Sequence, residues 1–298
     1  MKVEGSKIFS YLESDIISQH KKDVLHHNEK ILFHTHDGYE IYLFLNGDAD
    51  FFVETCGHHL QRGDLILTKP FEFHNVIAGE NQTYERLFIN LKENVITELS
   101  QGKENLASCF ETSIQKLNII HLGEDAVQQL VSLGNQLEQN LSENKYAKDL
   151  LTNALLTQIL IFINRKIEII EGDNSESKLL VSAKTMIPPL VEKILIYINQ
   201  HLTENLSVTR LAEDLGFNSD YLSRIFKSFT GASLQHFILI KKINYAQKLL
   251  NQGKTATEAC YLSGFNNYSN FSRSFSNITG KSPGKFQKLH QETGGIRV

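Results

Sequence analysis

The chain has 298 residues, of which 41% are hydrophobic, 21% charged and 9% aromatic, with a net charge of −4; this composition excludes disordered and fibrous proteins and predicts a folded globular one. The length predicts two domains, because single domains usually have about 100–150 residues. No window reaches the ~18 apolar residues of a membrane span and no apolar run follows the first lysines, so we expect a cytoplasmic protein with no membrane partner.

Charge divides unevenly along the chain. From Leu190 onward, 13 lysines and arginines face 7 acidic residues, a net charge of +6, whereas the preceding residues carry −10. A basic terminal domain suits a polyanionic partner such as DNA, although many helical domains carry this much charge as a solvated face. The three cysteines, Cys56, Cys109 and Cys260, form no CxxC pair, which favours a reducing cytosol over zinc or disulfide chemistry.

Residues 31–91 alternate short β-rich runs with turn signals such as Asn46-Gly47. The predicted strands read ILFHT, YEIYLFL, ADFFVET, DLILT, HNVIA and YERLFINL. Closely spaced strands without intervening helices favour an antiparallel β jelly roll, which we assign to a domain of residues 1–120. His58 and His59 follow Gly57 in an apparent turn and are predicted to lie on the surface.

Two motifs of polar residues fall within these strands. The first, H-x-H-x3-E-x6-G, comprises His34, His36, Glu40 and Gly47, and the second, looser one comprises Gly63, Pro70 and His74. They resemble the motifs of the cupin fold, whose metal-binding members use three histidines and a glutamate at these places. Imidazole and carboxylate ligands suit zinc, iron or manganese. Phe71, however, stands where the second motif usually has glycine, and the spacing to His74 is shortened.

We therefore expect a small-molecule pocket in the barrel and no resident cofactor, with a divalent metal as the alternative. The candidate effector-binding residues are His34, His36, Glu40, His74 and Tyr42. The same three histidines and Glu40 would be the metal ligands. A third possibility is that ordinary hydrogen bonds satisfy these histidines.

Residues 121–170 have the apolar periodicity of helices at 126–141 and 148–170. The second helix is unusually apolar for an exposed one. Two interpretations stay open: it packs within its own domain, or it also pairs with a second subunit in a homodimer. The polar stretch EGDNSESK begins an interdomain linker that we place at residues 171–186.

The last part of the chain, residues 187–298, contains a duplicated unit. LAEDLGFNSDYLSRIFKSFTGASLQHF and ACYLSGFNNYSNFSRSFSNITGKSPGKF align at Gly216-Phe217 and Gly264-Phe265, with one extra residue in the second turn. Each copy has two short apolar-faced helices joined by a glycine turn. This pattern predicts helix-turn-helix units at about 207–230 and 256–279, joined by a long helix within 233–255.

The second helix of each unit carries a polar face that can enter a major groove. Arg224 and Arg273 recur at the same place and are the best candidates for reading guanine through its O6 and N7. The alternative is a pair of solvent-exposed helical arginines, which recurrence makes less attractive.

Residues 188–287 resemble the DNA-binding domain of the AraC/XylS family of bacterial transcription regulators. The likeness is carried by LAEDLGFNSDYLSRIFKSFTG, IKKINYAQKLL and GFNNYSNFSRSFSNITGKSPGKF. It implies base contacts from the exposed faces of the two recognition helices. By position these residues are Asp220, Ser223, Arg224, Lys227, Tyr268, Ser269, Ser272 and Arg273.

The resulting prediction is a two-domain α+β protein, with an N-terminal cupin-like jelly roll flanked by helices and a C-terminal all-α tandem helix-turn-helix. The resemblance implies a non-enzymatic regulator of promoter DNA, controlled by a sugar or related metabolite in the barrel, with RNA polymerase as a further partner. One alternative is a cupin metalloenzyme, an isomerase or dioxygenase, fused to a DNA-binding module. Another is an architectural DNA binder without an effector.

Overall fold

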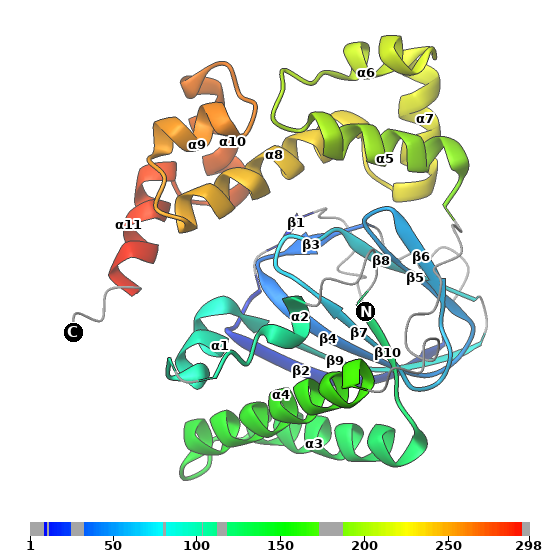
Figure 1. Ribbon diagram of the computed structural model, residues 1–298, viewed down its shortest axis with the longest axis vertical. Helices are drawn as coiled ribbons and strands as arrows, with labels where there is room; N and C mark the ends of the chain where they lie inside the picture. Colours follow the sequence, from blue (N-terminus) through cyan, green and yellow to red (C-terminus); the bar gives the residue numbers. More distant parts are fainter. Residues whose placement is uncertain are drawn as a thin grey trace. The chain divides into compact units, whose positions relative to one another are not determined.

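The computed structural model describes residues 9–10, 12–24, 33–79, 82–102, 104–111, 118–172 and 187–293. The chain forms two compact units, and the division falls between residues 186 and 187. The first unit is an antiparallel β structure with helices, and the second is entirely helical (Figure 1). The predicted two-domain α+β fold is therefore confirmed. None of the described helices is long and apolar enough to span a membrane.

Two antiparallel sheets form the β structure of the first unit, with strand orders β10-β7-β4-β9-β2 and β6-β5-β8. A further short sheet joins β1 and β3. The strands are β1 (Phe9–Ser10), β2 (Ile16–Val24), β3 (Thr35–His36), β4 (Gly38–Asn46), β5 (Ala49–Val53), β6 (Cys56–His59), β7 (Asp64–Thr68), β8 (His74–Ala78), β9 (Thr83–Lys92) and β10 (Ile119–His121).

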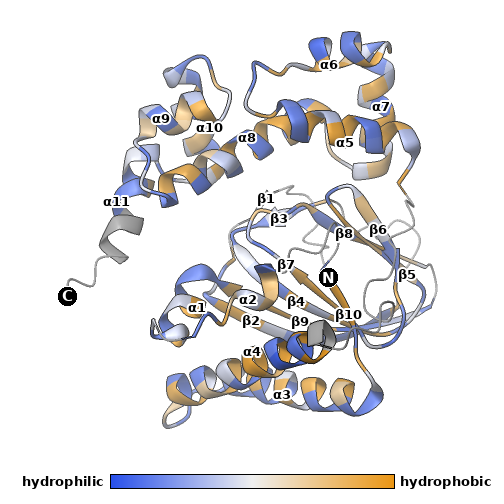
Figure 2. Cartoon of the chain, viewed as in Figure 1, coloured by the Kyte–Doolittle hydropathy of each residue, from blue (hydrophilic) through white to orange (hydrophobic). Residues whose placement is uncertain are grey.

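The larger sheet is buried on both faces, and side-chain alternation along β4 shows how. Ile41 and Leu43 join the core that the sheet shares with the helices, whereas Tyr42 and Phe44 join a second core with the residues of the smaller sheet. Burial on both faces explains why β4 and β7 are continuous apolar runs rather than alternating ones. Figure 2 shows apolar residues along β7 and β10.

Four helices accompany these strands: α1 (Glu93–Ser100), α2 (Ser108–Glu111), α3 (Glu124–Ser142) and α4 (Lys148–Gly172). Helix α3 packs on β2 and on α4, and its glycine, Gly134, lies against Leu87 of β9. A Cβ atom at Gly134 would lie 2.5 Å from a methyl carbon of Leu87, so this close approach requires glycine. Helix α4 extends two residues into the predicted linker, whose remaining residues lie outside the described ranges.

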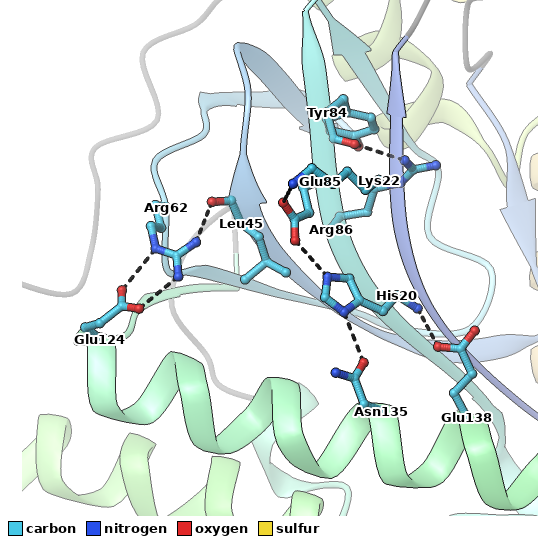
Figure 3. A network of polar contacts seen from close by, with 10 residues as sticks. All are labelled: His20, Lys22, Leu45, Arg62, Tyr84, Glu85, Arg86, Glu124, Asn135 and Glu138. Atoms are coloured by element: carbon cyan, nitrogen blue, oxygen red, sulfur yellow. Dashed lines mark hydrogen bonds and ion pairs between the residues drawn. The ribbon is translucent and has the colours of Figure 1, made fainter.

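Polar contacts fix α3 to the strands (Figure 3). The His20 backbone amide on β2 donates to Glu138 at 2.9 Å, and the His20 ring bonds Asn135 at 3.0 Å and Glu85 of β9 at 3.0 Å. At the start of the helix, Arg62 makes a two-pronged contact with Glu124. Helix α3 is therefore held at both ends by side chains as well as by its apolar face.

Among the described residues, the sequence interpretation missed four strands, β1, β2, β6 and β10. β2 is polar along most of its length and forms because it pairs with β9 over nine residues. Of the predicted strand ILFHT only Thr35 is in a strand, and its first two residues lie outside the described part of the chain. The surface placement of His58 is wrong: it lies in β6, is buried, and bonds the buried Asp64 at 2.8 Å.

The second unit contains seven helices among the described residues. They are α5 (Pro189–His201), α6 (Val208–Leu215), α7 (Ser219–Thr230), α8 (Leu234–Asn251), α9 (Ala256–Leu262), α10 (Tyr268–Thr279) and α11 (Pro283–Thr293). The pairs α6–α7 and α9–α10 are the two helix-turn-helix units, and α8 connects them (Figure 1). Helix α8 buries an apolar stripe that comprises Phe237, Ile240, Ile243, Ala246, Leu249 and Leu250.

Candidate DNA interface and effector site

The first helix-turn-helix unit is built from local capping signals. The Ser207 hydroxyl accepts a hydrogen bond from the amide of Arg210 at 3.1 Å, which starts α6. After a left-handed turn at Gly216, the Asn218 side chain accepts from the amides of Asp220 and Tyr221 and starts α7. Because both ends of the turn are capped, α7 begins at a defined residue and presents a defined face.

The second unit repeats this construction with different residues. Thr255 and Glu258 form a capping box at the start of α9, and Asn267 caps α10 by accepting from the amide of Asn270 at 2.9 Å. The buried residues of α7 are Leu222, Phe226 and Thr230, and those of α10 are Phe271, Phe275 and Thr279. These triplets correspond one to one in the predicted register, so the opposite faces correspond as well.

The eight predicted DNA-contacting residues all lie on the faces that turn away from these cores. Among them, six are exposed and two serines are half-buried at matching positions. The exposed residues are Asp220, Arg224, Lys227, Tyr268, Ser269 and Arg273, and the half-buried ones are Ser223 and Ser272. Each face therefore combines an exposed arginine with small polar groups.

The two arginines are available to a ligand. The Arg224 guanidinium lies 6.0 Å from the ring centroid of Tyr221, which supports it without neutralising it. Within the described ranges, no ion pair engages either Arg224 or Arg273. Asp220 lies in the first turn of α7, where a carboxylate interacts favourably with the helix dipole.

A groove of about 690 Å³ runs along the exposed face of α7. Its walls also include the first residues of α6 and α8, notably Thr209 and Ser233. The sequence interpretation did not single out these two residues, because their place beside the recognition face depends on the packing of three helices. Hydroxyl groups at two helix starts suit contacts with phosphate oxygens.

In the N-terminal β structure, the histidines of the two barrel motifs come together. His34, His36 and His74 each offer a ring nitrogen, and these atoms all lie within 4.8 Å of one another. Glu40 places Oε2 3.1 Å from Nε2 of His36 and 3.0 Å from Nε2 of His74. The predicted cluster therefore exists, from residues of β3, β4 and β8 and the segment before β3.

Burial and pairing set the protonation of this cluster. Burial by itself raises the pKa of Glu40, but the contacts with His36 and His74 outweigh it and hold that pKa well below its ordinary value. Burial by itself lowers the pKa of His74, yet the neighbouring Glu40 carboxylate leaves that pKa raised overall. The cluster thus favours a carboxylate surrounded by imidazoles.

The donor set also fits a divalent metal. The Nδ1 atom of His74 lies 3.0 Å from the carbonyl oxygen of Glu72, an orientation that directs Nε2 into the cluster. Among the described residues, the polar neighbour of that buried Nε2 atom is the Glu40 carboxylate at 3.0 Å. Phe71, at the position usually held by glycine, adopts a left-handed φ of 69°, a conformation that favours glycine.

Tyr42 lies apart from the histidines in its contacts. Its hydroxyl hydrogen-bonds the hydroxyl of Tyr84, and burial raises the pKa of Tyr84 to about 12. Phe51 packs beside Tyr42 with ring centroids 4.9 Å apart. This aromatic wall and the histidine cluster together make the barrel interior partly apolar and partly polar, as ligand sites generally are.

A second polar cluster, centred on the buried Asp64, was not predicted. Asp64 at the start of β7 accepts contacts from His58 and His121, each at 2.8 Å, and from the amide of Gln61. Burial raises the pKa of Asp64, but these partners outweigh it and leave that pKa lowered. The Arg62-Gly63-Asp64 turn signal was visible in the sequence, but nothing in it indicated the two histidines.

Comparisons with known proteins agree with this architecture. An AraC-like ligand binding domain model matches residues 24–160 and a helix-turn-helix domain model matches residues 211–289. The fold and the two helix pairs thus define a transcription regulator with a ligand-binding and a DNA-binding domain. The chain belongs to the AraC family of transcription regulators.

Individual relatives are distant. An uncharacterized HTH-type transcriptional regulator of Bacillus subtilis, YfiF, is 23% identical over 88% of this chain and 80% of that protein. A Staphylococcus aureus regulator, SAS0078, is 30% identical over 33% of this chain, which spans only 13% of that longer protein. Among solved structures, ToxT of Vibrio cholerae is 15% identical over 93% of this chain and 98% of that one, with a TM-score of 0.39.

Proposed function

We propose that this protein binds a specific promoter sequence through α7 and α10 and that a small molecule in the β barrel controls this binding. The observation that carries the proposal is the recurrence of an exposed arginine, Arg224 and Arg273, on two recognition helices whose buried faces correspond residue by residue. An architectural binder would need no such matched pair. We further propose that the protein acts in the cytoplasm, where RNA polymerase is the partner that reads out its position.

Selection from a random DNA library tests the DNA part of this proposal. The full-length protein should enrich a bipartite sequence whose two segments lie about one helical turn, ~34 Å, apart. Binding should weaken steeply with salt, since phosphate contacts release counterions. Enrichment of no common sequence would argue for nonspecific binding and against the regulator.

For the effector, we propose a sugar or related metabolite that contacts the His34, His36, His74 and Glu40 cluster. Hydroxyl groups can donate to the Glu40 carboxylate, and the Tyr42 and Phe51 rings offer an apolar wall. A metal held by the same four residues is the second candidate, favoured by the converging ring nitrogens. No observation favours an enzyme, since the family match is to regulators.

Thermal shift separates the two candidates. A ligand at 100 times its dissociation constant should stabilise the protein by about 2.7 kcal/mol and raise its melting temperature. We expect this shift with sugars, and its loss in His36→Ala but not in His59→Ala, since His59 is exposed and pairs with Asp50. A shift with Zn²⁺ or Mn²⁺ alone, lost in the same variant, would instead assign the cluster to a metal.

We propose a homodimer formed through the outer face of α4. One face of α4 is buried, with Leu156, Ile159 and Ile163 in the core. The opposite face keeps apolar residues in solvent: Leu150 is 72% exposed and Ile161 is 36% exposed. In a homodimer, the exposed apolar face of α4 in one copy would cover the same face in the other, because a two-fold axis brings identical faces together.

Sedimentation or light scattering tests the dimer. Leu150→Asp places a charge in the proposed interface and should shift the protein to a monomer, with little change in unfolding free energy because the side chain is already exposed. Gln129→Asp on the exposed face of α3 is the matched control and should leave the dimer intact. A wild-type protein that is monomeric at micromolar concentration contradicts this assembly.

A further inference from the structure

The connecting helix α8 carries a buried lysine that the DNA interface does not use. Lys242 is only 5% exposed and lies among the buried residues of α8. Buried lysines are uncommon because the charged group must find partners that replace water. The Lys242 ammonium group therefore needs hydrogen-bond acceptors within the protein.

Within the described part of the chain, the Lys242 ammonium bonds two backbone carbonyl groups, one in the loop that leads into the first helix-turn-helix unit and one in the turn of the second. Its Nζ donates to the oxygen of Glu204 at 2.8 Å, in the loop between α5 and α6. The same Nζ donates to the oxygen of Gly264 at 2.7 Å, in the turn between α9 and α10. It also lies 5.8 Å from the ring centroid of Phe265. One ammonium group thus connects the loop that leads into the first helix-turn-helix unit with the turn of the second.

The two segments also touch directly at Gly264. A Cβ atom there would lie 2.7 Å from both the Glu204 and the Leu202 carbonyl oxygens, and φ is +79°. The corresponding Gly216 of the first unit has a similar φ of +74° but nothing within 4 Å of its Cβ position. The left-handed turn therefore requires glycine in both helix-turn-helix units. Close packing against a neighbouring segment requires it only at Gly264.

This contact lies off the axis of α8 and so adds a constraint that the helix alone does not supply. The first half of α8 packs in the first unit, where Phe237 meets Phe226 at 5.0 Å and Lys241 bonds Asn199 of α5 at 2.8 Å. The second half, from Ile243 to Leu250, belongs to the core of the second unit. A single shared helix still permits bending and twisting between its halves, which a bridge beside it opposes.

We propose that Lys242 and Gly264 lock the two helix-turn-helix units into one orientation and thereby set the spacing of the two DNA segments that the protein accepts. The effect on DNA rests on the proposed function. Preorganisation lowers the cost of binding with both units at once, and a fixed separation rejects segments at other spacings. Lys242 is thus a positioning residue for DNA reading, because it acts through the orientation of the recognition helices.

Distances between spin labels test the lock without DNA. Labels on cysteines introduced at the exposed Glu213 of α6 and Asn277 of α10 report the separation of the units in the full-length protein, where the native cysteines are buried. We expect one narrow distance distribution in the unsubstituted sequence. Lys242→Met and Gly264→Ala should broaden it, whereas the matched controls Lys241→Met and Gly216→Ala should not.

Binding to the selected DNA provides the second readout. Lys242→Met should lose roughly tenfold or more in affinity for the preferred site, as expected for lost hydrogen bonds to a charged group. Inserting one base pair between the two DNA segments should reduce the affinity of Lys242→Met by a smaller factor than it reduces the affinity of the wild type. Simple destabilisation of the protein does not produce this difference. Gly264→Ala tests the same contact from the other side if Lys242→Met fails to fold.

The outcomes separate the two proposals. A broad distribution in the unsubstituted protein, or the same distribution in Lys242→Met, overturns the lock whatever the DNA results. If the protein selects no DNA sequence but the distance distributions behave as expected, the lock stands as a structural feature and the proposed DNA function fails.

Discussion

Arg224→Ala and Arg273→Ala should each weaken binding to the selected DNA site by about 1–3 kcal/mol and relax base preference at one position each. The two positions should lie in different segments of the site, since the arginines belong to different helix-turn-helix units. Both side chains are exposed and make no ion pair among the described residues, so folding stability should change little. Competition binding against sites with single base changes measures the effect.

The control for this experiment is Lys227→Ala on the same exposed face of α7. Loss of a lysine that contacts phosphate should weaken binding to all DNA sequences alike and lower the salt slope of binding by about one. If both arginine variants also reduce the affinity for every DNA sequence equally, the recognition helices contact only the DNA backbone. Specificity would then have to come from DNA shape rather than from base edges.

Phe275→Ala should destabilise the second helix-turn-helix unit by about 3–5 kcal/mol, the usual cost of emptying a buried aromatic site. Phe275 is fully buried and its ring packs against Phe271 and Phe286, with centroids 5.5 Å from each. A loss of this size is comparable to the stability of a small domain. We expect an early unfolding transition in denaturant, monitored by circular dichroism, and protection of only one DNA segment.

Asn277→Ala, two residues further along α10 and exposed, is the matched control and should change the unfolding free energy by less than about 0.5 kcal/mol. Equal losses from the two variants would mean that α10 packs on a different face. The correspondence with α7, on which the DNA interface depends, would then be wrong.

The helical half of this fold was largely predictable because its determinants are local. Ser207, Asn218 and Thr255 cap their helices through contacts within three residues, and the buried triplets recur at a fixed spacing. Duplication supplied an independent comparison, since the register that aligns Arg224 with Arg273 also aligns Phe226 with Phe275. The exposure of the predicted DNA-contacting residues follows from that register.

The barrel was predictable only in part, because its missing elements depend on distant partners. β2 has little apolar pattern and owes its existence to pairing with β9, and β10 is a three-residue strand that pairs with β7. The pairing of His58 with Asp64 joins β6 to β7, strands of different sheets, and the bridging position of Lys242 joins α8 to segments 38 and 22 residues away. In each case a polar residue that is ordinarily expected in solvent is buried.

At Gly134 the backbone of helix α3 lies directly against the Leu87 side chain of β9. At this point only the Leu87 side chain separates the backbone of α3 from β9, so we expect a displacement of β9 to reach α3. Because α3 packs on α4, we expect a molecule that shifts β9 to move the outer surface of the α3–α4 pair as well.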